Sequence, residues 1–256
     1  MKVLVNMITG VPAAPGAPTV PSANIRPIYP DRPEADAVEH WLLGNNDASL
    51  IGLKGASSLS PAGEAPSYGA GYISISTGTT RGLLTSIPDG DELTVCAVVK
   101  LDATPSGLNR IIAGTSQAGT GDGAGFALYN TASGGASALI RPNSSEVLFG
   151  STAMDPADGA WGFHALAIKG TGVDRARVGM VGGIGTASAA LATAYSPSTR
   201  NVALGNAYYV DGSDTFRAGM DVAEFIVFDR ALTASELALV YQRSKGRMAA
   251  RGIEVY

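Results

Sequence analysis

The residues that could hydrolyse a glycosidic bond are carboxylates near the end of the chain. A retaining glycosidase needs two carboxyl groups about 5 Å apart, and alternate positions of one strand bring side chains to the same face. Asp221 and Glu224 lie at an odd spacing, so in a regular strand they face opposite sides of the sheet. We identify neither a Glu-x-Asp-x-x-Glu nor a Glu-x-Asp-x-Glu spacing on a predicted strand. We therefore do not expect a glycoside hydrolase, or an enzyme of any other kind.

Two further patterns invite a chemical interpretation. The glycine-rich stretch 119–125 superficially resembles a nucleotide-binding loop, but it opens a strand-like run rather than a helix. We interpret it as a hairpin loop and expect no cofactor. His164 shares the parity of Leu166 and Ile168 along its strand. This pattern indicates a histidine in or near the core with its hydrogen bonds satisfied, rather than a general base.

A sugar-binding site needs an aromatic platform beside polar groups. The best candidates are Tyr208, Tyr209, Asp211 and Asp214, which follow one another closely in the sequence. The two aspartates also offer oxygen ligands at a spacing that calcium could use. Asp-Gly is equally an ordinary turn, so we predict no metal site and leave calcium as an alternative. His40 and Trp41 are interpreted either as a second stacking site or as a packing anchor.

The elements that must position these residues are short strands separated by turns. Alternating or dense apolar runs predict strands at 72–76, 93–101, 110–113, 125–129, 138–141, 147–150, 163–169, 175–181, 201–204 and 222–228. The Ser/Pro/Gly-rich stretch 55–70 reads as a loop, and 34–43 as a helical turn or the start of the first strand. Many short strands with one late helix predict an all-β sandwich.

The late helix has a recognisable start. Thr233 is the expected N-cap, and Glu236 closes a capping box three residues later. The strand 222–228 is expected to be central in its sheet, with the helix lying across the edge or end of that sheet. Arg243, Lys245, Arg247 and Arg251 complement the helix dipole. They predict a solvated helix end, with contact to an acidic partner as the alternative.

The closing stretch 223–241, AEFIVFDRALTASELALVY, resembles the last strand, turn and helix of laminin-G-like domains in the concanavalin A-like lectin/glucanase superfamily. The stretch Trp161–Lys169 is similar to the Trp-led central strand of that family, and the likeness covers about Leu93 to Tyr241. The resemblance implies a jelly-roll sandwich of two antiparallel sheets. The fold hosts lectins, hydrolases and passive interaction modules alike, so it does not by itself fix a function. The matching residues of the closing stretch are Glu224, Phe228, Asp229, Arg230, Ala231, Leu232, Glu236, Leu237 and Tyr241.

Residues 1–33 are rich in proline, which fixes φ and removes amide donors. We predict an extended, polyproline-like arm at 1–33 and a sandwich domain at 34–256. An arm without a core of its own needs a surface on which to lie, either a neighbouring subunit or its own domain. The residues expected to anchor it to a partner are Pro12, Pro15, Pro18, Pro21, Ile25, Pro27 and Tyr29.

Composition excludes several classes of function. The net charge is −4, which gives no electrostatic case for nucleic-acid binding. No apolar run approaches the 18 or so residues that a membrane span needs. Charged residues make up only 16% of the chain, against about 25% in typical soluble domains, which suggests that a partner covers part of the surface. The single cysteine, Cys96, is expected to be a buried and inert thiol.

A laminin-G-like module behind a short Pro-rich arm, with low charge and an Ala/Gly-rich sequence, resembles virion proteins of tailed bacteriophages. The resemblance implies a non-catalytic protein located in the virion, a tail or baseplate fibre or a receptor-binding module. A head-decorating protein and a free carbohydrate-binding lectin are the alternatives. The expected partners are other virion proteins, copies of the chain itself as a homotrimer, and a host-surface glycan.

Overall fold

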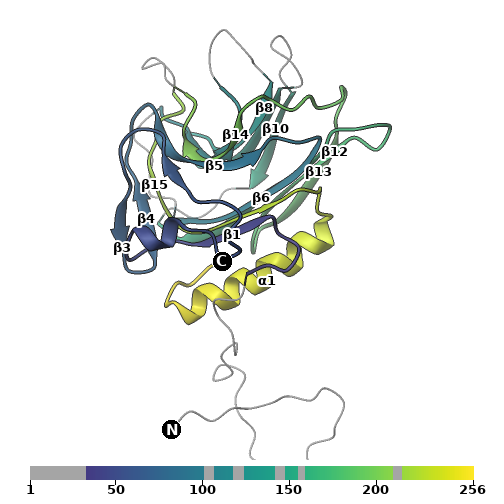
Figure 1. Ribbon diagram of the computed structural model, residues 1–256. Helices are drawn as coiled ribbons and strands as arrows, with labels where there is room; N and C mark the ends of the chain where they lie inside the picture. Colours follow the sequence, from purple (N-terminus) through teal and green to yellow (C-terminus); the bar gives the residue numbers. More distant parts are fainter. Residues whose placement is uncertain (1–32, 101–106, 118–123, 142–147, 155–158, 210–214) are drawn as a thin grey trace, which may run out of the picture.

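The strand Met220–Phe228 (β15) lies inside the larger of two β-sheets in the computed structural model (Figure 1). It pairs with β6 (Glu92–Lys100) along one side, and with β4 (Tyr72–Ile75) and β1 (Glu39–Leu42) along the other. The expectation that this strand is central is confirmed. The structure describes residues 33–100, 107–117, 124–141, 148–154, 159–209 and 215–256.

The two sheets are antiparallel and stack as a sandwich. The larger sheet has the order β13-β12-β11-β6-β15-β4-β3, with β1 added through β15, and the smaller sheet has the order β10-β9-β8-β7-β14-β5-β2. The remaining elements are a short 3₁₀ helix (Asp47–Leu50), β2 (Ser60–Pro61), β3 (Ser67–Gly69), β5 (Arg81–Pro88), β7 (Arg110–Gly114), β8 (Gly125–Asn130), β9 (Ala136–Arg141), β10 (Leu148–Met154), β11 (Trp161–Lys169), β12 (Ala176–Val181), β13 (Gly185–Ala190), β14 (Asn201–Asn206) and α1 (Ala234–Ala250).

All ten predicted strands are present, with boundaries shifted by a few residues. The predicted loop at 55–70 is wrong in part, because it contains β2 and β3 at the sheet edges. β5 and β13 were missed. β13 has the sequence GTASAA, whose small side chains carry no apolar periodicity.

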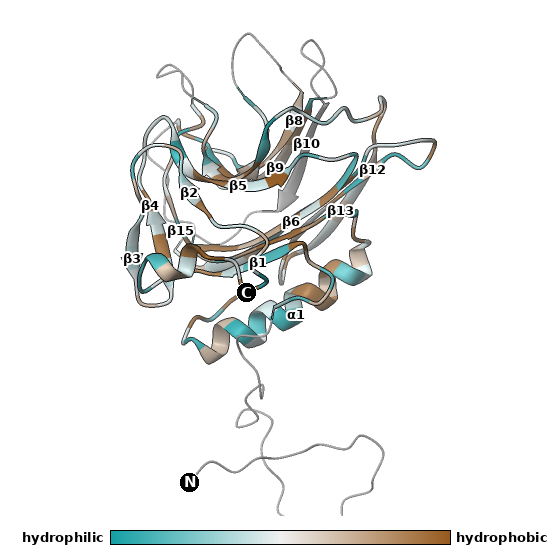
Figure 2. Cartoon of the chain, in the orientation of Figure 1, coloured by the Kyte–Doolittle hydropathy of each residue, from teal (hydrophilic) through white to brown (hydrophobic). Residues whose placement is uncertain are grey.

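Alternation along the strands divides the apolar residues into separate cores. One core fills the space between the sheets, and it includes Trp41, Val95, Phe126 and Phe225. A smaller cluster lies on the outer face of the smaller sheet, where Tyr129 packs against Phe216. Brown, apolar segments accordingly occur in strands of both sheets and on α1 in Figure 2. Trp41 is fully buried and stacks on Phe225 with ring centroids 5.4 Å apart, so it is a packing anchor.

Helix α1 covers the outer face of the larger sheet, so its expected position at the edge or end of that sheet is wrong (Figure 1). Its 17 residues span about 25 Å, which is enough to cross several strands. The predicted capping box is confirmed: Thr233 Oγ1 accepts from the amide of Glu236, and Glu236 accepts from the amide of Thr233. The buried apolar residues of the helix are Leu237, Val240, Tyr241 and Met248, and they pack on a layer that includes Cys96, Val98, Phe163, Ile226 and Phe228.

A β-bulge in β15 changes which residues face the helix. The register of β15 against β6 shifts between Val222 and Glu224. Val222 and Phe225 belong to the core between the sheets, so the residues Ala223 and Glu224 both face the helix. An extra residue of this kind reverses the parity of everything beyond it. The expectation that Asp221 and Glu224 face opposite sides is therefore wrong.

Candidate functional site

The carboxylates that could do chemistry are engaged in structural contacts. Asp221 Oδ1 accepts from Ser74 Oγ at 2.5 Å on the neighbouring strand. Glu39 accepts four backbone amides, from His40, Lys54, Ala56 and Ser57. Burial alone would raise the pKa of Glu39, but these four donors lower it on balance. A carboxylate held in this way stays ionised and cannot act as a general acid at neutral pH.

Sequence reasoning missed one carboxylate pattern. Glu34, Asp36 and Glu39 have the spacing Glu-x-Asp-x-x-Glu, which glucan hydrolases use on a single strand. Only Glu39 belongs to a strand here. Glu34 reaches toward helix α1, Asp36 reaches toward Arg230, and Glu39 binds the loop at 54–57. The three side chains therefore do not form a catalytic pair.

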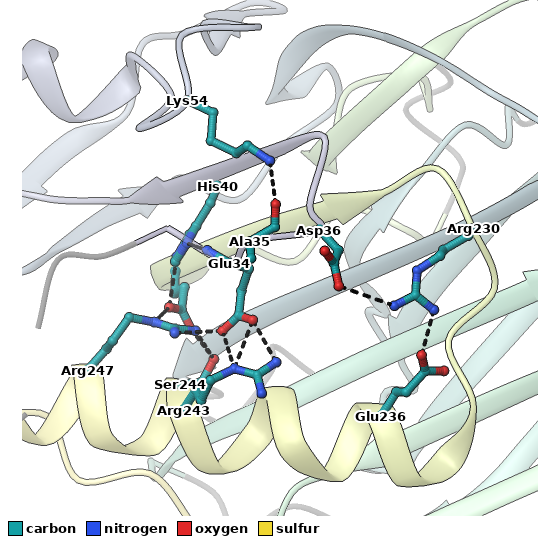
Figure 3. Close-up of polar contacts among 11 residues, drawn as sticks. Glu34, Ala35, Asp36, His40, Lys54, Arg230, Glu236, Arg243, Ser244 and Arg247 are labelled. Carbon is teal, nitrogen blue, oxygen red and sulfur yellow. Dashed lines mark hydrogen bonds and ion pairs between the residues drawn. The ribbon is translucent and has the colours of Figure 1, made fainter. Parts of the chain in front are cut away.

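A buried ion network joins Glu34 to helix α1 and to β15 (Figure 3). Arg247 is at its centre: Nη1 lies 2.7 Å from Glu34 Oε1, and Nε lies 2.6 Å from Glu224 Oε1. Arg243 Nη2 binds the other oxygen of Glu34 at 2.7 Å. Ser244 Oγ donates to Glu224 Oε2. Arg247 is buried, so the prediction of a solvated helix end is wrong at this residue.

His40 completes the network from the strand β1. Its Nε2 lies 2.9 Å from Glu224 Oε1, and its Nδ1 accepts from the backbone amide of Glu34 at 3.1 Å. Because Nδ1 is an acceptor, the ring proton sits on Nε2 and is donated to Glu224. Both nitrogens of His40 are thus engaged in holding the chain at Glu34 against β15.

The electrostatics of the network favour its ionised form. Burial alone would raise the pKa of Glu224, but the hydrogen bond from His40 and the charge of Arg247 lower it to about 2. The pKa of Glu34 is likewise lowered, because Arg243 and Arg247 outweigh its burial. The two glutamates raise the pKa of Arg247 against the effect of burial. The network is therefore a structural clamp in which Glu34, Glu224 and Arg247 stay charged at neutral pH.

The residues Pro33–Asp36 form the arm root, the point at which the chain enters the described part. Besides the Glu34 network, Lys54 Nζ donates to Ala35 O at 3.0 Å. Arg230 lies 3.8 Å from Asp36 and 2.7 Å from Glu236, all near the surface. Between the arm root and α1 lies a groove of about 820 Å³, hereafter the α1 groove, whose wall includes Leu239, Arg243 and Gly246.

The predicted sugar-binding residues do not share one environment. Tyr209 is only 3% exposed, and its ring packs against Phe216 on the outer face of the smaller sheet. A ring so covered cannot serve as an open stacking platform in this structure. Tyr208 is half-buried, and its hydroxyl donates to Asn201 O at 2.6 Å. Asp211 and Asp214 lie outside the described residues.

Tyr208 belongs to a polar cluster at the rim of the smaller sheet. The guanidinium of Arg200 lies 5.6 Å from the centre of the Tyr208 ring. Arg200 also donates to Thr115 O and Ala124 O, at 2.5 and 2.6 Å. Asp89 accepts from Thr115 Oγ1 and from the hydroxyl of Tyr195, and its burial raises its pKa. The cluster therefore fixes the chain on both sides of the segment 118–123.

His164 is buried as expected, but its hydrogen bonds are not satisfied. It is 0% exposed, and neither ring nitrogen has a hydrogen-bond partner in the structure as described. Burial, aided by the charge of Arg110, lowers the pKa of His164 to about 3. The expected parity is confirmed, since Leu166 and Ile168 belong to the core between the sheets. The ring is neutral and inaccessible at physiological pH.

Several further predictions concern, in part or in full, residues that lie outside the described part of the chain. All the anchoring residues predicted in the arm, Pro12, Pro15, Pro18, Pro21, Ile25, Pro27 and Tyr29, precede the first described residue. No group of three or more His, Cys, Asp or Glu side chains that could hold a metal occurs among the described residues. Among the described residues, no helix is both long enough and apolar enough to cross a bilayer.

Comparison with known proteins identifies the fold. A family model described as the concanavalin A-like lectin/glucanases superfamily matches residues 69–238, about two-thirds of the chain. No curated protein matches the chain. The receptor-binding domain of botulinum neurotoxin D matches with a TM-score of 0.58 at 11% identity, covering 81% of this chain and 52% of that one.

Two other structures give the same result. The ligand-binding domain of botulinum neurotoxin serotype D in complex with N-acetylneuraminic acid has a TM-score of 0.59 at 10% identity, over 81% of this chain and 50% of that one. Trypanosoma rangeli sialidase has a TM-score of 0.57 at 15% identity, over 82% and 33%. This chain thus spans about half of the toxin domains and a third of the sialidase. At such identities the likeness concerns the fold alone.

Proposed function

The chain belongs to the concanavalin A-like lectin/glucanases superfamily, and we propose that it serves as a non-catalytic structural protein of a tailed-bacteriophage virion. In this role it is a tail or baseplate fibre or a receptor-binding module. The arm at 1–33 anchors it to neighbouring virion proteins and to other copies of the chain, as a homotrimer. The sandwich at 34–256 is then presented outward.

The observation that carries this proposal is the position of the arm root. Glu34 is 5% exposed and is held by Arg243 and Arg247 of α1, on the outer face of the larger sheet. The smaller sheet, with Tyr208 at its rim, forms the opposite layer of the sandwich (Figure 1). An attachment point on one side leaves the other side free to face a ligand. Such a polarity suits a module that is fixed at one end and binds at the other.

The engaged carboxylates support the non-catalytic part of the proposal. Glu224 and Glu39 are both fully buried and accept charged or backbone donors. A glycosidase would need one carboxyl group that stays protonated near neutral pH, whereas the pKa of both groups is lowered. A head-decorating protein is the alternative position on a virion, and it would use the same arm and the same polarity.

Deletion of residues 1–32 tests the proposal. We expect the shortened protein to enter virions at least about tenfold less than the full chain, because the anchoring surface has been removed. Incorporation is measured by quantitative blotting of purified particles. The control keeps the length of the arm but replaces Ala13, Ala14, Gly16 and Ala17 with serine, which leaves every proline in place. Normal incorporation of the shortened protein would contradict anchoring by the arm.

Glycan binding is a second candidate function, and it rests on Tyr208. The ring of Tyr208 is half-buried beside the Arg200 guanidinium, so a planar cation and an aromatic ring lie together at a rim. Such pairs suit the carboxylate and the apolar face of an acidic sugar. The neurotoxin domain solved with N-acetylneuraminic acid shares the fold. Calcium at Asp211 and Asp214 stays an alternative to the prediction of no metal site.

Titration with N-acetylneuraminic acid tests this second function. We expect weak, saturable binding that Tyr208→Ala reduces by about tenfold, measured by saturation-transfer NMR. Tyr209→Phe is the matched control, because it removes only a hydroxyl that lies 3.2 Å from Ser116 Oγ and keeps the buried ring. Equal binding by the wild type and Tyr208→Ala would exclude Tyr208 from the site.

A further inference from the structure

The α1 groove lies between two elements that are far apart in the sequence. One of its walls is the arm root, Pro33–Asp36, and another is the face of α1 between Glu236 and Arg247. That part of α1 rises about 17 Å along the helix axis. A volume of about 820 Å³ lies within the range of sites that hold peptides or small ligands. The groove is therefore large enough to take a segment of extended chain.

The lining of the α1 groove favours an uncharged, apolar segment. Leu239 is 58% exposed in the groove, beside the buried residues Leu232 and Val240. The charged groups of the lining are already paired with one another: Arg243 with Glu34, and Arg230 with Asp36 and Glu236. A charged peptide would have to compete with these pairs. An apolar segment would cover Leu239 without disturbing them.

One segment of the chain fits this description. The stretch Val11–Pro21 contains no charged residue and has a proline at every third position, namely Pro12, Pro15, Pro18 and Pro21. A polyproline II helix has three residues per turn, so prolines at this spacing share one edge when the segment is bound in that form. Five or six residues in that form span about 17 Å, the length of the groove wall. Such segments dock in apolar grooves at a low cost in conformational entropy.

The length of the intervening chain indicates where this segment binds. Residues 22–32 separate Pro21 from the arm root, and in a proline-stiffened, extended form they reach about 34 Å. The arm root lines the same molecule's own groove, so a spacer held in that form would carry the segment past the groove of its own copy. We propose that the α1 groove binds the Val11–Pro21 segment of a second copy of the chain. This inference rests on the arm anchoring proposed above. It adds that the partner is a second copy of the chain and that the binding site is the α1 groove.

Self-association of the full chain tests the proposal. Sedimentation-equilibrium measurements are expected to show association that Leu239→Asp weakens by at least about tenfold, because a charge in the groove would be covered by an apolar segment. Ser235→Asp is the matched control: it adds the same charge at an exposed position of α1 that does not line the groove. Circular dichroism checks that both variants are folded. A monomeric wild type, or equal association of all three proteins, would overturn the proposal.

A mixing experiment separates binding to a second copy from binding within one copy. The variant Leu239→Asp has an intact arm and a blocked groove. A second variant, in which Pro12, Pro15, Pro18 and Pro21 are replaced by serine, has an intact groove and an altered arm. Neither variant should associate alone, but the mixture should form a complex. If the mixture forms no complex, the proposal that the arm of one copy binds the groove of another is wrong.

The outcome also distinguishes this inference from the proposed function. If the chain is monomeric in solution and deletion of residues 1–32 still abolishes incorporation into virions, the arm anchors the protein to a different virion protein. The function would then stand and the α1 groove would not be the seat of the arm. If deletion leaves incorporation unchanged while arm and groove variants both abolish association, the α1 groove does bind the arm of a second copy. The arm would then not anchor the protein in the virion.

Discussion

Replacing Arg247 with methionine is expected to lower the free energy of unfolding by about 3–5 kcal/mol, the range for breaking a buried ion pair. Arg247 is 6% exposed and binds Glu34 and Glu224 together. Without Arg247, the buried carboxylates of Glu34 and Glu224 lose part of the positive charge that balances them, and little water reaches them to solvate them. Urea denaturation followed by circular dichroism measures the change.

The neighbouring arginine supplies the control. Arg243 also binds Glu34, but 50% of its side chain is exposed, so the pair is screened by water. Arg243→Met is therefore expected to cost about 1 kcal/mol or less. A double substitution with Glu224→Leu should recover part of the loss from Arg247→Met, because one of the stranded charges is gone. Equal effects of the two arginine substitutions would show that the Arg247 network contributes no more than a surface pair.

The second large effect concerns pH. The protein is expected to lose roughly 2 kcal/mol of stability between about pH 7 and pH 5 through His164 alone. The unfolded chain binds a proton near the usual histidine pKa of 6.5, whereas burial holds the pKa of His164 in the folded protein at about 3. The unfolded state therefore binds more protons across this window. This contribution to stability is complete above the unfolded pKa and is lost as the pH falls toward the folded one.

His164→Leu isolates this contribution. Leucine has a similar size and suits the surrounding core, so the variant should be about 1 kcal/mol more stable at neutral pH, since two unpaired ring nitrogens are removed. Its stability should also change less with pH over the same window, as measured by urea midpoints at several pH values. Glu224 does not interfere, because its pKa is held at about 2. Parallel pH curves for the two proteins would refute the assignment.

Local signals accounted for most of the fold. Dense apolar runs predicted β6, β11 and β15, and the Thr233–Glu236 capping box predicted the start of α1. β13 carries only small side chains, and β5 lies between turns and ends at a proline, so neither gave a clear strand pattern. The bulge at Ala223 and Glu224 depends on pairing with β6, and a single strand read alone does not reveal it.

The candidate site was less predictable because it depends on contacts between residues far apart in the sequence. Glu34 and Arg247 are separated by 213 positions, and Glu224 and His40 by 184. The basic residues of α1 were read as a solvated helix end, since nothing in their local sequence indicates a buried carboxylate opposite them. One signal was available: a Glu-x-Asp-x-x-Glu spacing at 34–39, next to the proline-rich segment.

The short strand β1 gives the molecule a particular mechanical character. β1 enters the sheet beside β15, in the middle of the larger sheet, and Glu34 just before it is tied to α1. A tensile load applied through the N-terminal segment would first meet the Glu34–Arg247 link and then the β1–β15 ladder. The first described residues of the chain are thus held by two separate contacts, the ion network and the β1–β15 ladder, which a pulling force would have to break in turn.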